Sequence, residues 1–194
     1  MEKQLNVITF FPSLFNYSFN EQEVPQFILD SLILSNRGSQ ASIIVTQPRR
    51  ISAISVAARV SQERLEDGSV GYAIRGESKQ NENTKLLFCT TGVVLRRLST
   101  GDSLEDISHI VVDEVTFTLK LQSPSLTTYS VYQVHERSLD GDFLLLELKE
   151  LLKSHPTLKV VLMSATINHE TFVKYFDDAP LLTIPGFAHP VIDM

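Results

Sequence analysis

Residues 107–115, which read ISHIVVDEV, place two adjacent carboxylates directly after a run of apolar residues. Apolar β-branched runs are typical of a strand that is buried on both faces of a parallel sheet. Asp113 and Glu114 then stand at the carboxyl end of that strand, where open α/β sheets have their ligand crevices. One carboxylate there can hold Mg²⁺ through water, and its neighbour can orient an attacking water. An isolated Asp-Glu pair is more often an ordinary acidic turn, so the rest of the sequence decides between the two interpretations.

The composition is that of a folded chain of one domain. Apolar residues make up 43% and charged residues 21% of 194 residues, enough for a substantial core. The formal net charge of −6 predicts no general affinity for nucleic acid, so any such binding must come from local patches. Cys89 is the single cysteine, which excludes an internal disulfide and suits a reducing intracellular compartment. No apolar run reaches the length of about 18 residues that a membrane span needs, and we expect no signal peptide.

Apolar runs alternate with amphipathic stretches along the chain. We expect strands at residues 5–11, 41–46, 70–74, 85–89, 107–115, 158–163 and 181–184. We expect helices at residues 24–34, 51–65 (capped by Ser52), 93–98, 142–154 and 168–176 (capped by Asn168), and a polar loop at 75–84. This alternation predicts an α/β fold, a parallel sheet with helices on both faces, in a single domain over residues 1–194.

Four polar turns directly follow predicted strands, at residues 46–50 (TQPRR), 90–92 (TTG), 113–114 (DE) and 164–166 (SAT). Right-handed crossovers bring the ends of parallel strands to one edge of a sheet, so we expect the turns to converge there. Arginines beside the amides of a helix N-terminus suit a phosphate, and a glycine at a helix start allows an anion to approach closely. Considered singly, each turn also has an ordinary interpretation as a solvated turn or a helix cap.

Other chemistries find no support in the sequence. Cys89 has no second thiol, and the five histidines show no zinc-ligand spacing. No Gly-x-Ser-x-Gly elbow is present for a serine nucleophile. The cluster His135-Glu136-Arg137 has the composition of ordinary surface charges.

In order and spacing, the turns resemble motifs of the first RecA-like domain of the DEAH-box ATP-dependent RNA helicases. TQPRRISAISVAARVSQE (46–63) is similar to motif Ia with its helix, and TTGVVLRRL (90–98) to the next nucleic-acid motif. DEV (113–115), followed later by HERSLDGDFLLLELKELL (135–152), is similar to motif II and its helix, and LMSAT (162–166) to motif III. The resemblance covers about residues 24–191, with an interruption at 116–134, and implies a RecA-like sheet of the P-loop NTPase type.

The resemblance also implies roles for individual residues. Asp113 would coordinate Mg²⁺ through water, and Glu114 would position the hydrolytic water. The path of the RNA backbone would be lined by Thr46, Gln47, Pro48, Arg49, Arg50, Thr91 and Gly92. ATP hydrolysis would be coupled to domain movement by Ser164, Ala165 and Thr166. The implied cofactors are ATP and Mg²⁺. The implied partners are RNA and ribonucleoprotein or ribosome-associated proteins. The implied compartment is the cytoplasm, with the nucleus as the alternative.

The first departure from the family is at the phosphate loop. The family's Gly-x-x-x-x-Gly-Lys-Thr belongs before the helix at 24–34, where residues 10–23 read FFPSLFNYSFNEQE, with neither glycine nor lysine. Losing about four charge-assisted hydrogen bonds of about 1.5–3 kcal/mol each costs about 6 kcal/mol or more. That loss is about 10⁴ in affinity. We therefore expect the sheet to be incomplete at its first strand and phosphate loop, and no measurable ATP hydrolysis by this chain.

The second departure is in motif II, where the family reads Asp-Glu-x-His-Glu-Arg without interruption. Here residues 116–134 separate DEV from His135, Glu136 and Arg137. Removing them restores DEVHERSLDGDF, which suggests a short intron translated in frame; a genuine insertion would be a loop beside the site that displaces His135. Phe187 also takes the arginine position of the family's exit turn. The second RecA-like domain that the resemblance implies is not among the 194 residues.

The preferred hypothesis is a helicase ATP-binding domain that is truncated and inactive as written. The main alternative is a non-enzymatic module, a helicase remnant that binds RNA or docks a partner through its basic turns. A third is a product that does not fold stably, because loss of the first strand-loop-helix crossover would expose an edge of the parallel sheet.

Overall fold

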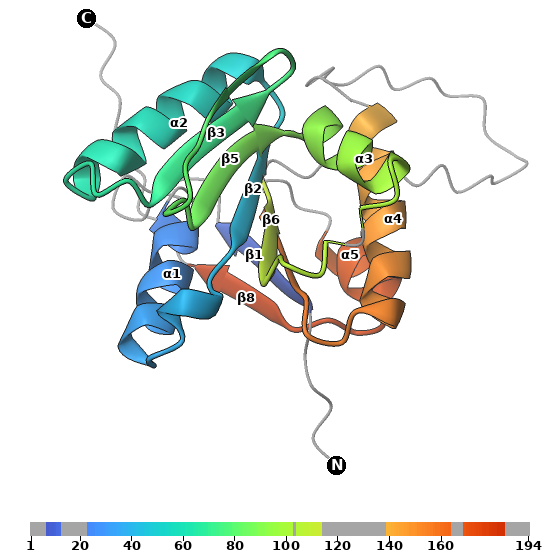
Figure 1. The fold of residues 1–194 in the computed structure, drawn as a ribbon. Coiled ribbons are helices and arrows are strands. Elements are labelled where there is room, and N and C mark those ends of the chain that lie inside the picture. The colour runs from blue at the N-terminus through green and yellow to red at the C-terminus, as the bar shows by residue number, and fades with distance from the viewer. Residues whose placement is uncertain (1–6, 13–22, 103, 114–138, 164–168, 185–194) are drawn as a thin grey trace, which may run out of the picture.

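The computed structural model describes residues 7–12, 23–102, 104–113, 139–163 and 169–184 (Figure 1). Within them, one sheet has the strand order β4-β3-β5-β2-β6-β7-β1-β8. All neighbouring strands are parallel except β4, which is antiparallel to β3. The strands are β1 (Val7–Pro12), β2 (Ile43–Gln47), β3 (Val70–Ile74), β4 (Glu77–Lys79), β5 (Leu86–Thr90), β6 (His109–Val112), β7 (Lys159–Met163) and β8 (Leu181–Ile184). The helices are α1 (Val24–Leu34), the 3-10 turn η2 (Gly38–Gln40), α2 (Arg50–Glu63), α3 (Thr91–Ser99), α4 (Leu139–Ser154) and α5 (His169–Tyr175).

The sheet separates two apolar clusters, because successive strand residues point to opposite faces. Ile43 and Val45 of β2 pack toward α1 and α2, in a cluster that includes Leu29 and Val60. Ile44 points the other way, into a cluster with side chains of α3, α4 and α5. Figure 1 shows these two helical layers on either side of the sheet. The central strands are therefore apolar on both faces, as the β-branched runs in the sequence predict.

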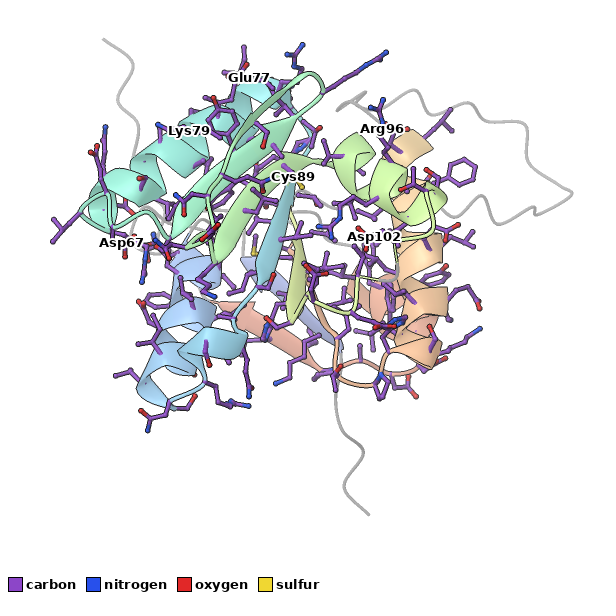
Figure 2. The ribbon with its side chains drawn as sticks, in the orientation of Figure 1. Asp67, Glu77, Lys79, Cys89, Arg96 and Asp102 are labelled. Atoms are coloured by element: carbon purple, nitrogen blue, oxygen red, sulfur yellow. The ribbon has the colours of Figure 1, made fainter. Side chains whose placement is uncertain are left out.

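Cys89, labelled in Figure 2, belongs to the second cluster. Only 1% of its surface is exposed, and burial raises the pKa of its thiol to about 12. The thiol is therefore fully protonated in the folded protein at neutral pH.

The predicted parallel sheet with helices on both faces is confirmed. The bounds of α1, β3 and β8 are as predicted, and the other elements differ by at most three residues at an end. Three details of the prediction are wrong, and the first two concern the loop at 75–84 and the cap of α2. The polar loop at 75–84 contains β4, which turns back on β3 through Gly76 at φ +86°, a conformation that glycine adopts without strain. Ser52 does not cap α2, since that helix begins at Arg50, with Arg49 as its cap residue. Asn168 lies outside the described residues.

The third correction concerns the first strand. β1 lies between β7 and β8, with Ile8 opposite Val161 and Phe10 opposite both Met163 and Leu182. The sheet is therefore complete at this position, and the edge that the loss of β1 would have exposed is covered. Residues 13–22, which hold the place of the phosphate loop, lie outside the described residues.

Ser108 and His109 tie the start of β6 to the start of β2. The backbone N–H of Ser42 donates to Ser108 Oγ (3.1 Å), and Ser108 Oγ donates to the Ser42 carbonyl (2.9 Å). His109 Nδ1 lies 3.0 Å from Ser108 Oγ, and its side chain is 8% exposed. Burial lowers the pKa of His109 to about 4, and the nearby charges of Lys159 and Arg37 add to this effect.

We expect stability to fall as the pH drops from 6.5 to about 4, because an unfolded histidine binds its proton near pH 6.5 and folded His109 only near pH 4. The unfolded state thus binds more protons in this window. Between pH 7 and pH 5, the free energy of unfolding of the wild type should fall by about 1–2 kcal/mol more than that of His109→Gln. Urea titration at each pH measures both values. The same dependence in His109→Gln would contradict the assignment.

Candidate functional site

The strands β5, β2, β6 and β7 end side by side and form what we call the carboxyl edge of the sheet. Gln47 is opposite Thr90, Thr46 is opposite Val112, and Val112 is opposite Leu162. The turns that follow β2 and β5 and the acid that follows β6 therefore converge on one edge, as predicted. The predicted fourth turn, Ser164 to Thr166, lies outside the described residues.

A short hydrogen bond joins the ends of β2 and β6. Gln47 Nε2 donates to Asp113 Oδ2 over 2.6 Å, and the Asp113 backbone N–H donates to the Thr46 carbonyl (3.3 Å). Gln47 lies two residues after Val45, and Asp113 lies two residues after Val111. Both are therefore on the face of the sheet that packs toward α1 and α2. Because only 4% of Gln47 is exposed, its amide is a fixed donor. The carboxylate of Asp113 is thus held on the α1 side of the sheet.

The side chains at this place suit an Mg²⁺ ion that keeps most of its waters better than a metal ion held entirely by protein ligands. Among the described residues, no group of three or more His, Cys, Asp or Glu side chains could hold a metal ion. Mg²⁺ commonly keeps several waters and is held by one or two carboxylates together with substrate phosphates. Asp113 is the described carboxylate at the carboxyl edge that fits such a role, and Gln47 would fix its orientation.

The helix α2 begins at the carboxyl edge with features that do not stabilise it. Its cap residue Arg49 has an extended backbone (φ −116°, ψ 144°) and makes no side-chain cap hydrogen bond, and no acidic residue occupies the first turn. Arg49 and Arg50 are both exposed. Cations are unfavourable at a helix N-terminus, where the backbone N–H groups and the dipole favour an anion. These arginines therefore match an anionic ligand better than they match the helix.

The helix α3 begins beside it in a similar way. Its cap residue Thr90 makes no side-chain cap hydrogen bond, and the first turn contains no acid. Thr91 is half-buried, and Gly92 is exposed. A Cβ on Gly92 would lie 3.7 Å from Asp140 Oδ2, an ordinary contact, so the described fold tolerates a side chain there. A requirement for glycine at this position would come from a bound ligand.

The predicted RNA-contacting residues divide into a buried and an exposed group. Thr46 and Gln47 are 1% and 4% exposed, so their side chains support the edge from within. Within the described part of the chain, Thr46 Oγ1 has no hydrogen-bond partner. The exposed or half-buried members are Pro48, Arg49, Arg50, Thr91 and Gly92. Direct contact with RNA is therefore a prediction for this second group.

The remaining predicted site residues lie outside the described residues, namely Glu114, His135, Glu136, Arg137, Ser164, Ala165 and Thr166. Their roles stay predictions. Two contacts were missed by sequence reasoning: the Gln47–Asp113 hydrogen bond and the approach of Asp140 to the start of α3. The first could have been found by counting the alternation of β2 and β6 in register, since both residues follow a valine that faces α1 and α2. Nothing in the sequence indicates the second, which depends on how α4 packs.

Comparison with curated proteins assigns the family. The chain is 49% identical over 174 residues to a DExH-box ATP-dependent RNA helicase of Arabidopsis thaliana, an alignment that covers 89% of this chain and 16% of the relative. A second such helicase of Arabidopsis thaliana is 50% identical over 171 residues, 87% of this chain and 13% of that protein. The chain belongs to the DEAH/DExH-box helicase family. An ATP-dependent DNA/RNA helicase of Bos taurus is 44% identical over 176 residues, 88% of this chain and 16% of its own length.

This DEAH/DExH-box chain spans about a sixth or less of the length of these relatives. No family model matches the chain. The α/β fold agrees with a RecA-like helicase domain. None of the helices in the described residues is long and apolar enough to cross a membrane.

Replacement of the Thr46 hydroxyl, which has no hydrogen-bond partner within the described residues, should not destabilise the protein. Thr46→Val keeps the shape of the side chain and removes a buried polar atom, so we expect the free energy of unfolding to stay equal or to rise by up to about 1 kcal/mol. Ser108→Ala is the control, because it removes two hydrogen bonds to Ser42, and should lower stability by about 1–2 kcal/mol. Urea unfolding at pH 7 measures both. A loss in Thr46→Val as large as in the control would show that its hydroxyl has a partner.

Proposed function

We propose that the carboxyl edge of this chain binds the backbone of RNA, as part of the first RecA-like domain of a DEAH-box ATP-dependent RNA helicase. We further propose that the chain does not hydrolyse ATP by itself. The observation that supports RNA binding is the pair of helix starts without side-chain caps, one of which carries two exposed arginines. Both starts lie on the sheet edge that holds Asp113.

This binding would be sequence-tolerant. Backbone N–H groups and guanidiniums contact phosphate, which carries no sequence information. The net charge of −6 gives no long-range attraction for RNA, so the affinity depends on these few local contacts and on the salt concentration.

The nucleotide half of the proposed site is only partly built. Asp113, oriented by Gln47, would hold Mg²⁺ through water, and Glu114 would position the attacking water. Residues 10–23 offer neither glycine nor lysine to grip the phosphates. The acids would then be present without the group that delivers ATP to them, which is why we propose that hydrolysis is lost. Coupling of ATP hydrolysis to domain movement by Ser164, Ala165 and Thr166 would depend on a second RecA-like domain. We include in the same proposal ribonucleoprotein partners in the cytoplasm.

A non-enzymatic RNA-binding module is the second candidate. The composition of residues 10–23 supports it, because RNA contacts at the carboxyl edge need no phosphate loop. The two candidates differ in one measurable property. If the chain still binds ATP without hydrolysing it, its RNA affinity responds to ATP, whereas the RNA affinity of a remnant does not.

Removal of both arginines at the start of α2 should weaken RNA binding. Each lost phosphate contact lowers the slope of log affinity against log salt by about 0.7 for a single strand. For Arg49→Gln/Arg50→Gln we therefore expect a slope lower by about 1.4 and, at low salt, about tenfold weaker binding of a 12-nucleotide RNA. Fluorescence anisotropy measures both quantities.

Arg59→Gln is the control, because Arg59 lies on the same helix in an ion pair with Glu63 (2.7 Å). It should bind RNA like the wild type. Equal binding by all three proteins would refute RNA contact at the start of α2.

The purified chain should show no ATP hydrolysis above background, with or without RNA, because residues 10–23 lack the phosphate-gripping residues. Glu114→Gln should then release phosphate at the same rate as the wild type in a coupled phosphate assay. An RNA-stimulated rate in the wild type that Glu114→Gln abolishes would contradict this expectation and support an active helicase domain.

A further inference from the structure

The start of α3, which the proposed function assigns to RNA, already has a carboxylate beside it. Gly92 is the second residue of α3, and Asp140 is the second residue of α4. The two helices pack against each other, side by side in Figure 1. A Cβ on Gly92 would lie 3.7 Å from Asp140 Oδ2, the one described atom from another part of the chain within 4 Å of that position. The packing of α4 thus brings an acid to a helix start that has none of its own.

The carboxylate of Asp140 is not neutralised by a cation of the described structure. The side chain is exposed, and no ion pair within the described ranges includes it. Arg96 lies one turn beyond Gly92 on the same face of α3 and is not its partner, and Arg97 pairs with Asp102 (2.7 Å). The positive charge beside Asp140 is instead that of two helix N-termini, because α3 and α4 both begin there.

Two anions cannot share the start of α3 without cost. The first N–H groups of a helix have no partner within the helix, and together with the dipole they favour one negative charge. A carboxylate and an RNA phosphate within a few ångströms of each other repel. A phosphate therefore reaches the N–H groups of α3 at full strength only when the Asp140 side chain turns away.

We propose that Asp140 is an autoinhibitory residue of the carboxyl edge, whose carboxylate competes with the RNA backbone for the start of α3 and lowers the affinity for RNA. This inference rests on the proposed RNA binding at that edge and adds its regulation. The two adjacent helix starts then act differently. At α2 the exposed Arg49 and Arg50 attract a phosphate, whereas α3 adds its contact only after Asp140 is displaced.

A structural role at the start of α4 does not by itself require Asp140. Asp142 also lies in the first turn of that helix and is half-buried, so α4 keeps an acid at its N-terminus without Asp140. A purely structural Asp140 would affect the stability of the protein and leave its RNA affinity unchanged. The two roles therefore predict different measurements.

Asp140→Asn keeps the size of the side chain and removes its charge. We expect this variant to bind a 12-nucleotide RNA about fivefold more tightly than the wild type at low salt, because a like charge leaves the contact. The gain should shrink as salt is added, since ions screen exposed charges. Fluorescence anisotropy measures the affinities, and circular dichroism with thermal melting checks that every variant is folded.

Glu147→Gln is the matched control, because it removes the same charge from an exposed position of the same helix, about 10 Å further along its axis. It should bind RNA like the wild type, which separates the local contact from a general change in net charge. Asp140→Glu retains the charge and should also resemble the wild type. A gain in Glu147→Gln as large as in Asp140→Asn overturns the inference.

The RNA measurements separate this inference from the proposed function. Unchanged affinity in Asp140→Asn, together with weaker binding by Arg49→Gln/Arg50→Gln, overturns the inference and leaves the proposed function standing. Weaker binding by Asp140→Asn overturns it as well, and would make Asp140 a direct contact to RNA, such as an acceptor for a ribose hydroxyl.

A second readout uses no RNA and holds even if the chain binds none. Inorganic phosphate, titrated at constant ionic strength, should shift the NMR signal of the Gly92 backbone N–H at a lower concentration in Asp140→Asn than in the wild type. The same phosphate dependence in both proteins overturns the inference, whatever the RNA measurements show.

Discussion

The hydrogen bond from Gln47 to Asp113 joins the two central strands at the place where the sheet meets solvent. A carboxylate at the end of a buried strand can point in several directions, and a fixed amide donor restricts it to one. That donor is itself immobile because β2 is covered on both faces. The orientation of the acid thus depends on the packing of the whole sheet, since α1 and α2 bury β2 from one side and the cluster of α3, α4 and α5 buries it from the other.

The backbone N–H and C=O groups are hydrogen-bonded differently at the two ends of the sheet. At the carboxyl edge, helices begin without side-chain caps and leave N–H groups for a ligand or water. At the opposite edge, where β2 and β6 begin, Ser108 Oγ bonds both backbone polar groups of Ser42, and a neutral histidine is packed beside it. The first arrangement leaves backbone N–H groups open at some cost in helix stability, while the second ties the starts of β2 and β6 to each other.

Much of the fold was accessible from the sequence because its strands are apolar runs and its helices have clear periodicity. The bounds of α1 and β3 followed from apolar spacing alone. The cap at Ser52 was misplaced because the extended residue before α2 is an arginine, a type that sequence rules do not favour at a cap. The first strand was doubted because residues 10–23 depart from the family, yet β1 pairs with β7 and β8 through residues 7–12 and shares only three residues with that stretch. In the site, residue types and turn positions were predictable, whereas the partner of Asp113 required the strand register.

The single thiol of Cys89 is a built-in probe of sheet opening. It lies near the end of β5, and it is protonated and inaccessible in the closed fold. Disulfide exchange needs an exposed thiolate, so a soluble aromatic disulfide can react only with molecules in which β5 has separated from its neighbours. The labelling rate of the unmodified protein then reports how often its centre opens. A ligand that holds the strand ends together would slow that reaction without touching the sulfur.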